Sequence, residues 1–343
     1  MTVSNARRHT SQLTPHASNM RAVVIPQIGN SSVLTLSDDV PKPNAKAGEV
    51  LVKLDYAGVN FVDTYQRSGL YPVTLPCIAG REGAGTIESL GADVPDEYDL
   101  HIGDRVAVFA QGTMAEYVCA EAKGVLKLPQ QVSTKEGAAI MLQGLTAWTL
   151  VRDAYDIQEG NCILVQAAAG GTGGLVVQMA KHLGAHVIGT TSSVEKAKVA
   201  KGYNCDHVIN YKEQNVEKEV MKLTSNHGCH AVFSGIGQAT FAADLACTRR
   251  MGTLVTYGNS SGAITSMKPL DLSKKNVKLV RPTLANYIVE REEFVARSRE
   301  LLDLVAEGAV KVRIGAEYEL QDLGMAQDDL TGQKTVGKLI VKI

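Results

Sequence analysis

With 343 residues, 45% of them hydrophobic and 21% charged, the chain has the composition of a globular protein large enough for two domains. Its 35 Lys and Arg residues nearly balance its 36 Asp and Glu residues, for a formal net charge of -1, so neither nucleic acid nor an anionic membrane surface is expected as a partner. The six cysteines form no Cys-x-x-Cys pair, which predicts reduced thiols and a cytoplasmic protein rather than a disulfide framework.

The first segment, residues 1–19, is polar, contains Arg7 and Arg8, and has no acidic residue. A mitochondrial presequence shares these features, but Pro15 and the lack of an apolar helical face favour a disordered tail. We therefore expect a disordered tail over 1–19 and the folded part from Met20 onward.

Short β patterns punctuated by Gly and Pro fill the next third of the chain, and such spacing predicts a compact antiparallel barrel. The expected strands are 20–25, 49–54, 85–88, 103–108 and 115–118. A helical pattern from Thr134 to about Tyr155 follows them.

Strand and helix patterns then alternate, which is typical of a doubly wound α/β domain with a parallel sheet. The expected strands are 162–166, 186–189, 207–210, 231–233 and 252–257, and the expected helices end at 183, 201 and 224. A further helix over 291–306 and a strand over 338–343 close the chain.

A glycine-rich stretch, ILVQAAAGGTGG from Ile163 to Gly174, joins the first strand of this domain to its first helix. Ala168-x-Gly170-x-x-Gly173 matches the dinucleotide-binding fingerprint, with Ala in place of the first Gly. Bare backbone N–H groups and the positive end of the helix dipole attract phosphate at such a turn. The stretch therefore predicts a pyrophosphate site.

The end of the second strand selects the cofactor, because an acid there grips the ribose 2′-OH of NADH. This chain has Thr190-Thr-Ser-Ser193 followed by Lys196. Hydroxyls and a lysine suit a 2′-phosphate, so the pattern favours NADPH. Glu195 is discordant, and we expect it to face solvent from the following helix.

These pieces together resemble the medium-chain dehydrogenase/reductase superfamily, and within it the zeta-crystallin-like quinone oxidoreductase family. The resemblance runs from Met20 to the end and rests on the segments AGVNFVDTY (57–65), SGLYP (68–72), GREGAG (80–85), GLT (144–146), AAAGG (167–171) and YGNSSG (257–262). It implies an α/β protein in which a GroES-like, partly open β-barrel (20–146 and 283–343) flanks a Rossmann NADPH-binding domain (147–282).

Zinc-dependent members of the superfamily carry Cys where Asn60 stands and His where Arg81 stands. An amide and a guanidinium are not usual zinc ligands, and the cysteine-rich lobe that holds a structural zinc in those enzymes is missing. We therefore expect no metal. For Arg81 we favour a structural ion pair over a catalytic role.

The resemblance also implies roles for single positions. The turn after the strand that ends near Gly58 would bring two side chains to the nicotinamide and the acceptor, a tyrosine would cover the cofactor, and a threonine would lie beneath the nicotinamide: Asn60, Tyr65, Tyr71 and Thr146. The cofactor would be held by Gly170, Gly171, Thr172 and Gly173 at the pyrophosphate, by Ser192, Lys196 and Tyr211 at the 2′-phosphate, and by Tyr257, Ser260 and Thr283 at the ribose and carboxamide.

Alternatives stay open for several of these side chains. Packing is the alternative role for Tyr65 and Tyr71, hydrogen bonding within a turn is the alternative for Asn60, and a solvated helix face is the alternative for Lys196. Some relatives carry a basic residue over the 2′-phosphate where this chain has Gln333 next to Lys334, which weakens the expected preference for NADPH.

The function expected from this resemblance is metal-free reduction of quinones by NADPH in a homodimer or higher oligomer. A rival within the superfamily is an NADPH-dependent alkenal, enone or enoyl reductase. A rival of another class is an RNA-binding or structural role, as in zeta-crystallin-like proteins, but the near-neutral charge gives it no support.

Overall fold

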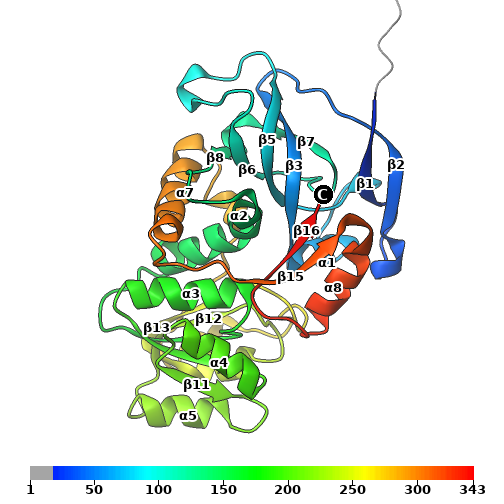
Figure 1. The fold of residues 1–343 in the computed structure, drawn as a ribbon. Coiled ribbons are helices and arrows are strands. Elements are labelled where there is room, and N and C mark those ends of the chain that lie inside the picture. The colour runs from blue at the N-terminus through cyan, green and yellow to red at the C-terminus, as the bar shows by residue number, and fades with distance from the viewer. Residues whose placement is uncertain (1–17) are drawn as a thin grey trace, which may run out of the picture.

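The computed structural model describes residues 18–343, and in that part of the chain it contains three β-sheets and eight α-helices. Figure 1 shows two halves, with the first third of the chain in the upper half and a helix-covered sheet in the lower one. The C-terminal strand returns to the upper half. The expected tail lies almost wholly outside the described residues, and Asn19 already begins the first strand.

The upper half consists of two sheets. A three-stranded sheet has the order β2-β1-β4, with β1 (Asn19–Ile25), β2 (Thr35–Pro41) and β4 (Cys77–Ile78). A seven-stranded sheet has the order β15-β16-β3-β5-β6-β8, with β7 paired to β3. Its strands are β3 (Glu49–Val59), β5 (Glu82–Leu90), β6 (Arg105–Phe109), β7 (Tyr117–Glu121), β8 (Val125–Lys127), β15 (Ile314–Glu319) and β16 (Lys338–Lys342). Because β16 pairs antiparallel with β3, the end of the chain completes the expected barrel.

The lower half is a six-stranded sheet of order β11-β10-β9-β12-β13-β14, and all its strand pairs are parallel. Its strands are β9 (Cys162–Val165), β10 (His186–Thr191), β11 (His207–Asn210), β12 (Cys229–Ser234), β13 (Thr248–Thr256) and β14 (Lys278–Val280). The helices α3 (Gly171–His182), α4 (Val194–Gly202), α5 (Val216–Leu223) and α6 (Phe241–Cys247) connect them. The strand order reverses between β9 and β12, which is the point where ligands bind in such sheets.

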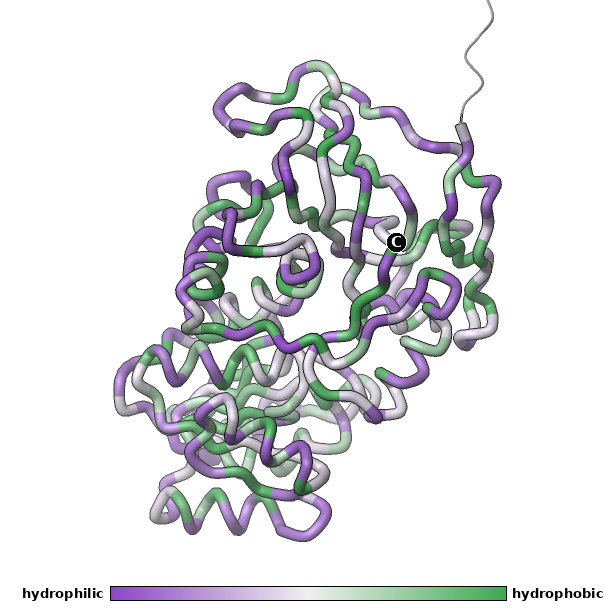
Figure 2. The backbone as a smooth tube through the Cα atoms, in the orientation of Figure 1, coloured by the Kyte–Doolittle hydropathy of each residue, from purple (hydrophilic) through white to green (hydrophobic). Residues whose placement is uncertain are grey.

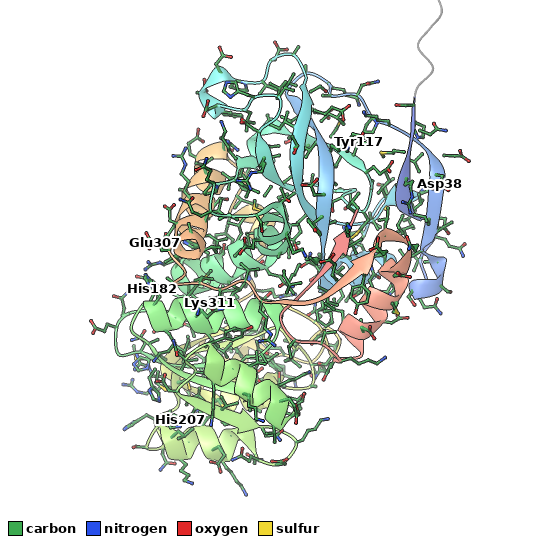
Figure 3. All side chains as sticks on the ribbon, in the orientation of Figure 1. Asp38, Tyr117, His182, His207, Glu307 and Lys311 are labelled. Atoms are coloured by element: carbon green, nitrogen blue, oxygen red, sulfur yellow. The ribbon has the colours of Figure 1, made fainter. Side chains whose placement is uncertain are left out.

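Two helices, α2 (Thr134–Thr149) and α7 (Arg291–Ala306), join the halves. Ser133 caps α2 in a reciprocal pair with Glu136. One cluster of buried side chains runs from barrel strands through both helices into the parallel sheet, and hydrophobic segments of the tube in Figure 2 concentrate in the same interior. Labelled charged side chains such as Asp38 and Glu307 are exposed in Figure 3. A continuous core of this kind holds the two halves in one arrangement.

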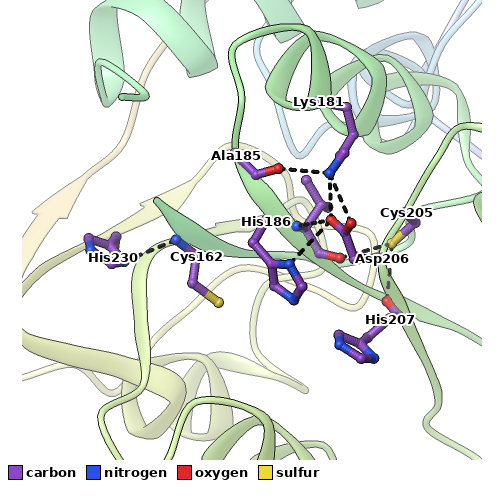
Figure 4. Close-up of polar contacts among 9 residues, drawn as sticks. Cys162, Lys181, Ala185, His186, Cys205, Asp206, His207 and His230 are labelled. Atoms are coloured by element: carbon purple, nitrogen blue, oxygen red, sulfur yellow. Dashed lines mark hydrogen bonds and ion pairs between the residues drawn. The ribbon is translucent and has the colours of Figure 1, made fainter. Parts of the chain in front are cut away.

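The far edge of the parallel sheet is held by Asp206, which precedes β11 (Figure 4). Its carboxylate accepts hydrogen bonds from Lys181 Nζ at 2.8 Å and from the Val187 amide at 2.7 Å. Burial raises the pKa of Asp206, but these hydrogen bonds outweigh it, so the pKa lies below its usual value. The carboxylate thus ties α3 and β10 together on the side of the sheet away from the glycine-rich turn.

The α/β class, the barrel and the parallel sheet are all as predicted, and the helix expected over 291–306 has those bounds. The sequence did not predict several short elements: β2, β4, β8, β14, β15, α1 (Phe61–Arg67), α6 and α8 (Leu323–Thr331). The helix expected to reach Tyr155 ends at Thr149 and continues as a single π-helical turn to Ala154. The predicted domain boundary at 146/147 falls inside α2, which belongs to both halves. The domain limits therefore stay a prediction.

Candidate active site

A cavity of about 750 Å³ lies between the barrel and the carboxyl ends of the parallel strands. All fourteen residues that the sequence assigns to catalysis or cofactor binding line it. They come from α1 and the residues next to it, α2, the glycine-rich turn, α4, the ends of β10, β11 and β13, and the segment after β14. Side chains far apart in the chain therefore meet in one place, and this is what a single site requires.

The glycine-rich turn narrows one wall of the cavity. Ala167 adopts a left-handed conformation, with φ 53°, and Gly170 caps α3, whose first turn contains no acidic residue. A Cβ atom on Gly173 would lie 2.3 Å from the carbonyl oxygen of Ala167, so only glycine lets the turn close this tightly. The bare backbone and the helix N-terminus fit a pyrophosphate.

A second corner of the cavity collects Ser192, Lys196 and Tyr211. Lys196 Nζ donates to the carbonyl oxygen of Gln333 at 2.7 Å, and the Tyr211 hydroxyl donates to the Gln333 side chain at 3.4 Å. Burial, with Lys212 nearby, lowers the pKa of Lys196. A half-buried ammonium is stabilised when an anion binds beside it, so this corner suits a 2′-phosphate.

Two charged side chains next to this corner do not line the cavity. Glu195 is exposed and does not line the cavity, as expected. Lys334, which follows Gln333, turns away and pairs with Asp329 at 3.2 Å. Lys196 is therefore the cation that the structure offers a phosphate here.

Tyr65 faces the cavity from the barrel side. It lies in α1 rather than on the predicted turn, because Asn60 caps a short helix over Phe61–Arg67. Its hydroxyl oxygen accepts a hydrogen bond from the Asn259 backbone N–H at 3.1 Å, which leaves the hydroxyl proton free. Burial raises the pKa of Tyr65, so the group stays a neutral hydrogen-bond donor.

Tyr71 bridges the two halves of the molecule. Its hydroxyl oxygen accepts a hydrogen bond from Arg281 Nη2 at 3.0 Å. In the orientation of the Asn259 side-chain amide that gives every contact a donor and an acceptor, its oxygen accepts from the Tyr71 hydroxyl at 3.2 Å. Its nitrogen then donates to the Gly258 carbonyl at 3.0 Å. The rings of Tyr65 and Tyr71 meet edge to face at 5.2 Å. The Tyr71 hydroxyl is thus fully bonded and positions the wall of the cavity.

Asn60 is 2% exposed, and its amide faces inward. The amide oxygen accepts from Lys338 Nζ at 2.7 Å, and Nδ2 donates to Glu82 at 2.7 Å and toward the Gly58 carbonyl at 3.4 Å. Both Nδ2 hydrogens are therefore used within the protein. The idea that this amide donates to an acceptor does not fit this geometry, and a positioning role fits better.

Sequence reasoning missed the ion pair beneath Asn60. Lys338 and Glu82 are 2% and 0% exposed and pair with each other, and a second oxygen of Glu82 accepts from the Leu142 amide at 2.6 Å. The sequence feature that could have indicated this pair is Lys338, a lysine at the start of the apolar C-terminal strand. Because a buried charge needs a partner, that lysine required an acid elsewhere in the fold.

Arg81 also differs from expectation. Within residues 18–343 no carboxylate lies within ion-pair distance of its guanidinium, so it forms no structural ion pair. Instead Nη1 donates to Gln111 Oε1 at 3.2 Å, and the guanidinium lies over the Phe109 ring, 5.5 Å from its centroid. Arg81 and Phe109 both line the cavity.

The remaining predicted residues surround the middle of the cavity. Thr146 projects from α2, Tyr257 follows β13, and Thr283 follows β14. The Ser260 amide donates to the Gly235 carbonyl at 3.2 Å, which holds the segment after β13 against the end of β12. The roles of these residues toward a cofactor stay predictions.

The described part of the chain contains no group of three or more His, Cys, Asp and Glu side chains placed to hold a metal ion. It also contains no helix with the length and apolar character needed to cross a membrane.

The fold and the cavity define a dehydrogenase of the medium-chain type. Residues 46–130 match the family model of the alcohol dehydrogenase GroES-like domain, and residues 171–307 match that of the zinc-binding dehydrogenases. The first model covers most of the β3 to β8 part of the barrel, and the second runs from the start of α3 through β10 to β14 of the parallel sheet.

Comparison with similar proteins identifies the family within this class of dehydrogenases. The chain is 37% identical to a quinone oxidoreductase from Pseudomonas aeruginosa over 91% of this chain and 96% of that one. It superposes on a mycobacterial protein solved with NADPH (TM-score 0.91, 38% identity, 94% of this chain and 100% of that one). It also superposes on Escherichia coli quinone oxidoreductase solved with NADPH (TM-score 0.90, 34% identity, 94% and 100%). The chain belongs to the quinone oxidoreductase family.

Proposed function

We propose that this protein is an NADPH-dependent quinone reductase. One observation carries the proposal: a single cavity joins a pyrophosphate-binding turn and a lysine corner to an aromatic wall on the barrel side. The similarity to two proteins solved with NADPH supports the cofactor. The similarity to proteins named as quinone oxidoreductases supports the acceptor. NADPH, when bound, supplies the hydride, and one proton from solvent completes the two-electron reduction of a quinone to a hydroquinone.

The chain's own residues bind and orient in this reaction. Gly170, Gly171, Thr172 and Gly173 would hold the pyrophosphate, while Ser192, Lys196 and Tyr211 would hold the 2′-phosphate. Tyr257, Ser260 and Thr283 would hold the ribose and the carboxamide. Thr146, on α2 between the two halves, would support the nicotinamide ring. Holding both reactants in one geometry is the largest contribution a protein makes to such a transfer.

Tyr65 is the group we propose to act on the acceptor. Its oxygen already accepts from the Asn259 amide, and this polarises the hydroxyl and orients its proton. The proton is then available to a quinone oxygen as negative charge develops there. Asn60 acts indirectly, since its backbone N–H donates to Asp63 at 2.8 Å and caps the helix that carries Tyr65.

A turnover assay with NADPH against a panel of quinones and enones tests the proposal. Rapid oxidation of NADPH with quinones is the expected result. Preference for enones with little quinone turnover would assign the alkenal, enone or enoyl reductase activity instead. No oxidation with any acceptor would favour an RNA-binding or structural role.

We also propose a dimer, or a higher oligomer, formed through the parallel sheet. Among the strands of residues 18–343, its edge strand β14 pairs only with β13, and Leu270, which precedes this edge, is 77% exposed. Two such edges brought together by a two-fold axis would cover this apolar surface. A mass of one 36.6 kDa chain measured by light scattering would refute the proposal.

The compartment is a separate proposal. The six free cysteines support a reducing compartment such as the cytoplasm.

A further inference from the structure

The acceptor end of the cavity contains a cation that the proposed reaction does not use. Three cationic side chains, Arg81, Lys196 and Arg281, line the cavity, and no Asp or Glu is among the described residues that do so. Lys196 lies at the 2′-phosphate corner. Arg281 is anchored by the Thr256 carbonyl at 2.8 Å and by Tyr71. Arg81 is the one that projects from the barrel, the side on which Tyr65 lies.

Arg81 is held in place without being neutralised. Gln111 donates to the Ile78 carbonyl at 2.7 Å, and this turns its amide oxygen toward the guanidinium. The Phe109 ring supports the guanidinium face. Neither contact supplies a negative charge, so the full positive charge of Arg81 remains at the cavity wall.

Two acids near Arg81, its chain neighbour Glu82 and Asp63, do not neutralise it either. Glu82 is committed to Lys338 in the buried pair. Asp63 is fully buried, and burial raises its pKa to about 7, so a large part of the population is uncharged near neutral pH. The guanidinium therefore has N–H groups and charge to offer a ligand.

We propose that Arg81 is an anion subsite for the acceptor, and that the enzyme favours quinones carrying a carboxylate or sulfonate substituent. The inference rests on the proposed reductase activity and names its substrate class. The planar guanidinium pairs with such an oxyanion through two parallel hydrogen bonds. Phe61, Val62 and Phe109 form the apolar wall for the quinone ring, while Tyr65 donates to the reacting carbonyl.

The test compares 1,4-naphthoquinone with 1,4-naphthoquinone-2-sulfonate in the wild type and in Arg81→Gln. For the sulfonate, kcat/KM is expected to fall by about 10- to 100-fold, the loss that follows removal of a charged hydrogen-bonding partner. For the neutral quinone it should stay within about threefold, the range of a rim substitution. Arg21→Gln is the matched control, because it removes the same charge from a surface pair with Asp38 on the barrel and Arg21 does not line the cavity.

A binding measurement separates this inference from the proposed function. Calorimetric titration of the NADP⁺-loaded protein with naphthalene-2-sulfonate needs no turnover, and Arg81→Gln should weaken that affinity by a similar factor. If wild type reduces neither quinone, the proposed function fails while the titration still decides the subsite. Arg81→Lys, which keeps the charge, should retain measurable affinity and covers the case in which the Gln variant does not fold.

Three results would overturn the inference. Equal losses for both quinones would mean that Arg81 shapes the site without selecting charge. Unchanged affinity for naphthalene-2-sulfonate in Arg81→Gln would mean that no anion binds there. Weaker binding of NADPH in the same variant would assign the cation to the cofactor.

Discussion

Replacing Lys196 by Ala is expected to remove most of the preference for NADPH over NADH. In the structure its ammonium is tethered at 2.7 Å to the Gln333 carbonyl and lies beside Ser192 and Tyr211. A hydrogen bond to a charged group contributes roughly 1.5–3 kcal/mol. Because this side chain is only half-buried, solvent screening reduces the value to about 1–2 kcal/mol. This corresponds to NADPH binding weakened by about 5- to 30-fold.

Fluorescence titration of the protein with each cofactor measures the effect. Wild type should bind NADPH at least about tenfold more tightly than NADH, since the 2′-phosphate gains the lysine contact and finds no acid. Lys196→Ala should leave the NADH constant nearly unchanged and spare turnover at saturating NADPH. Lys198→Ala is the matched control, because Lys198 is exposed on the same helix and does not line the cavity.

Two results would refute this reasoning. Equal wild-type affinities for the two cofactors would mean that the corner does not hold a 2′-phosphate. Equal losses for NADPH and NADH in Lys196→Ala would mean that the lysine acts by holding the Gln333 segment rather than by meeting the phosphate.

Tyr65→Phe should lower quinone turnover by about one to two decades while leaving the NADPH dissociation constant nearly unchanged; wild-type rates with several quinones would reduce Tyr65 to packing. Exhaustive chelation should leave turnover intact, because an amide and a guanidinium stand where zinc ligands would be; activity lost and restored by added zinc would contradict this. Asp206→Asn should lower the free energy of unfolding by about 1 kcal/mol at neutral pH. Since the folded-state pKa of Asp206 is depressed, its contribution is present above the unfolded pKa and is lost as pH falls through the folded one. Urea unfolding at several pH values should therefore show wild type and variant converging in acid, and a constant difference would assign the loss to packing.

Local patterns were sufficient wherever the signal lies within a few neighbouring residues. The glycine-rich turn predicts its own strand, turn and helix, because the missing side chains at Gly170 and Gly173 and the apolar run before them are properties of one short segment. The acid missing after β10 is likewise read directly from 190–193. The resemblance then supplied fourteen site positions, and all of them line one cavity. Their chemical roles remain predictions.

The tertiary structure alone decided how side chains at that cavity share their hydrogen bonds. Asn60 faces Glu82 and Lys338 because β16 returns to pair with β3, a contact between residues 278 positions apart. No local pattern encodes such a pairing. The orientation of Tyr65 depends on Asn259 from the other half of the molecule, and Arg81 lacks an acidic partner because the nearby Glu82 is already committed. Sequence determines which chemical groups are present, whereas long-range packing decides which of them remain free to meet a ligand.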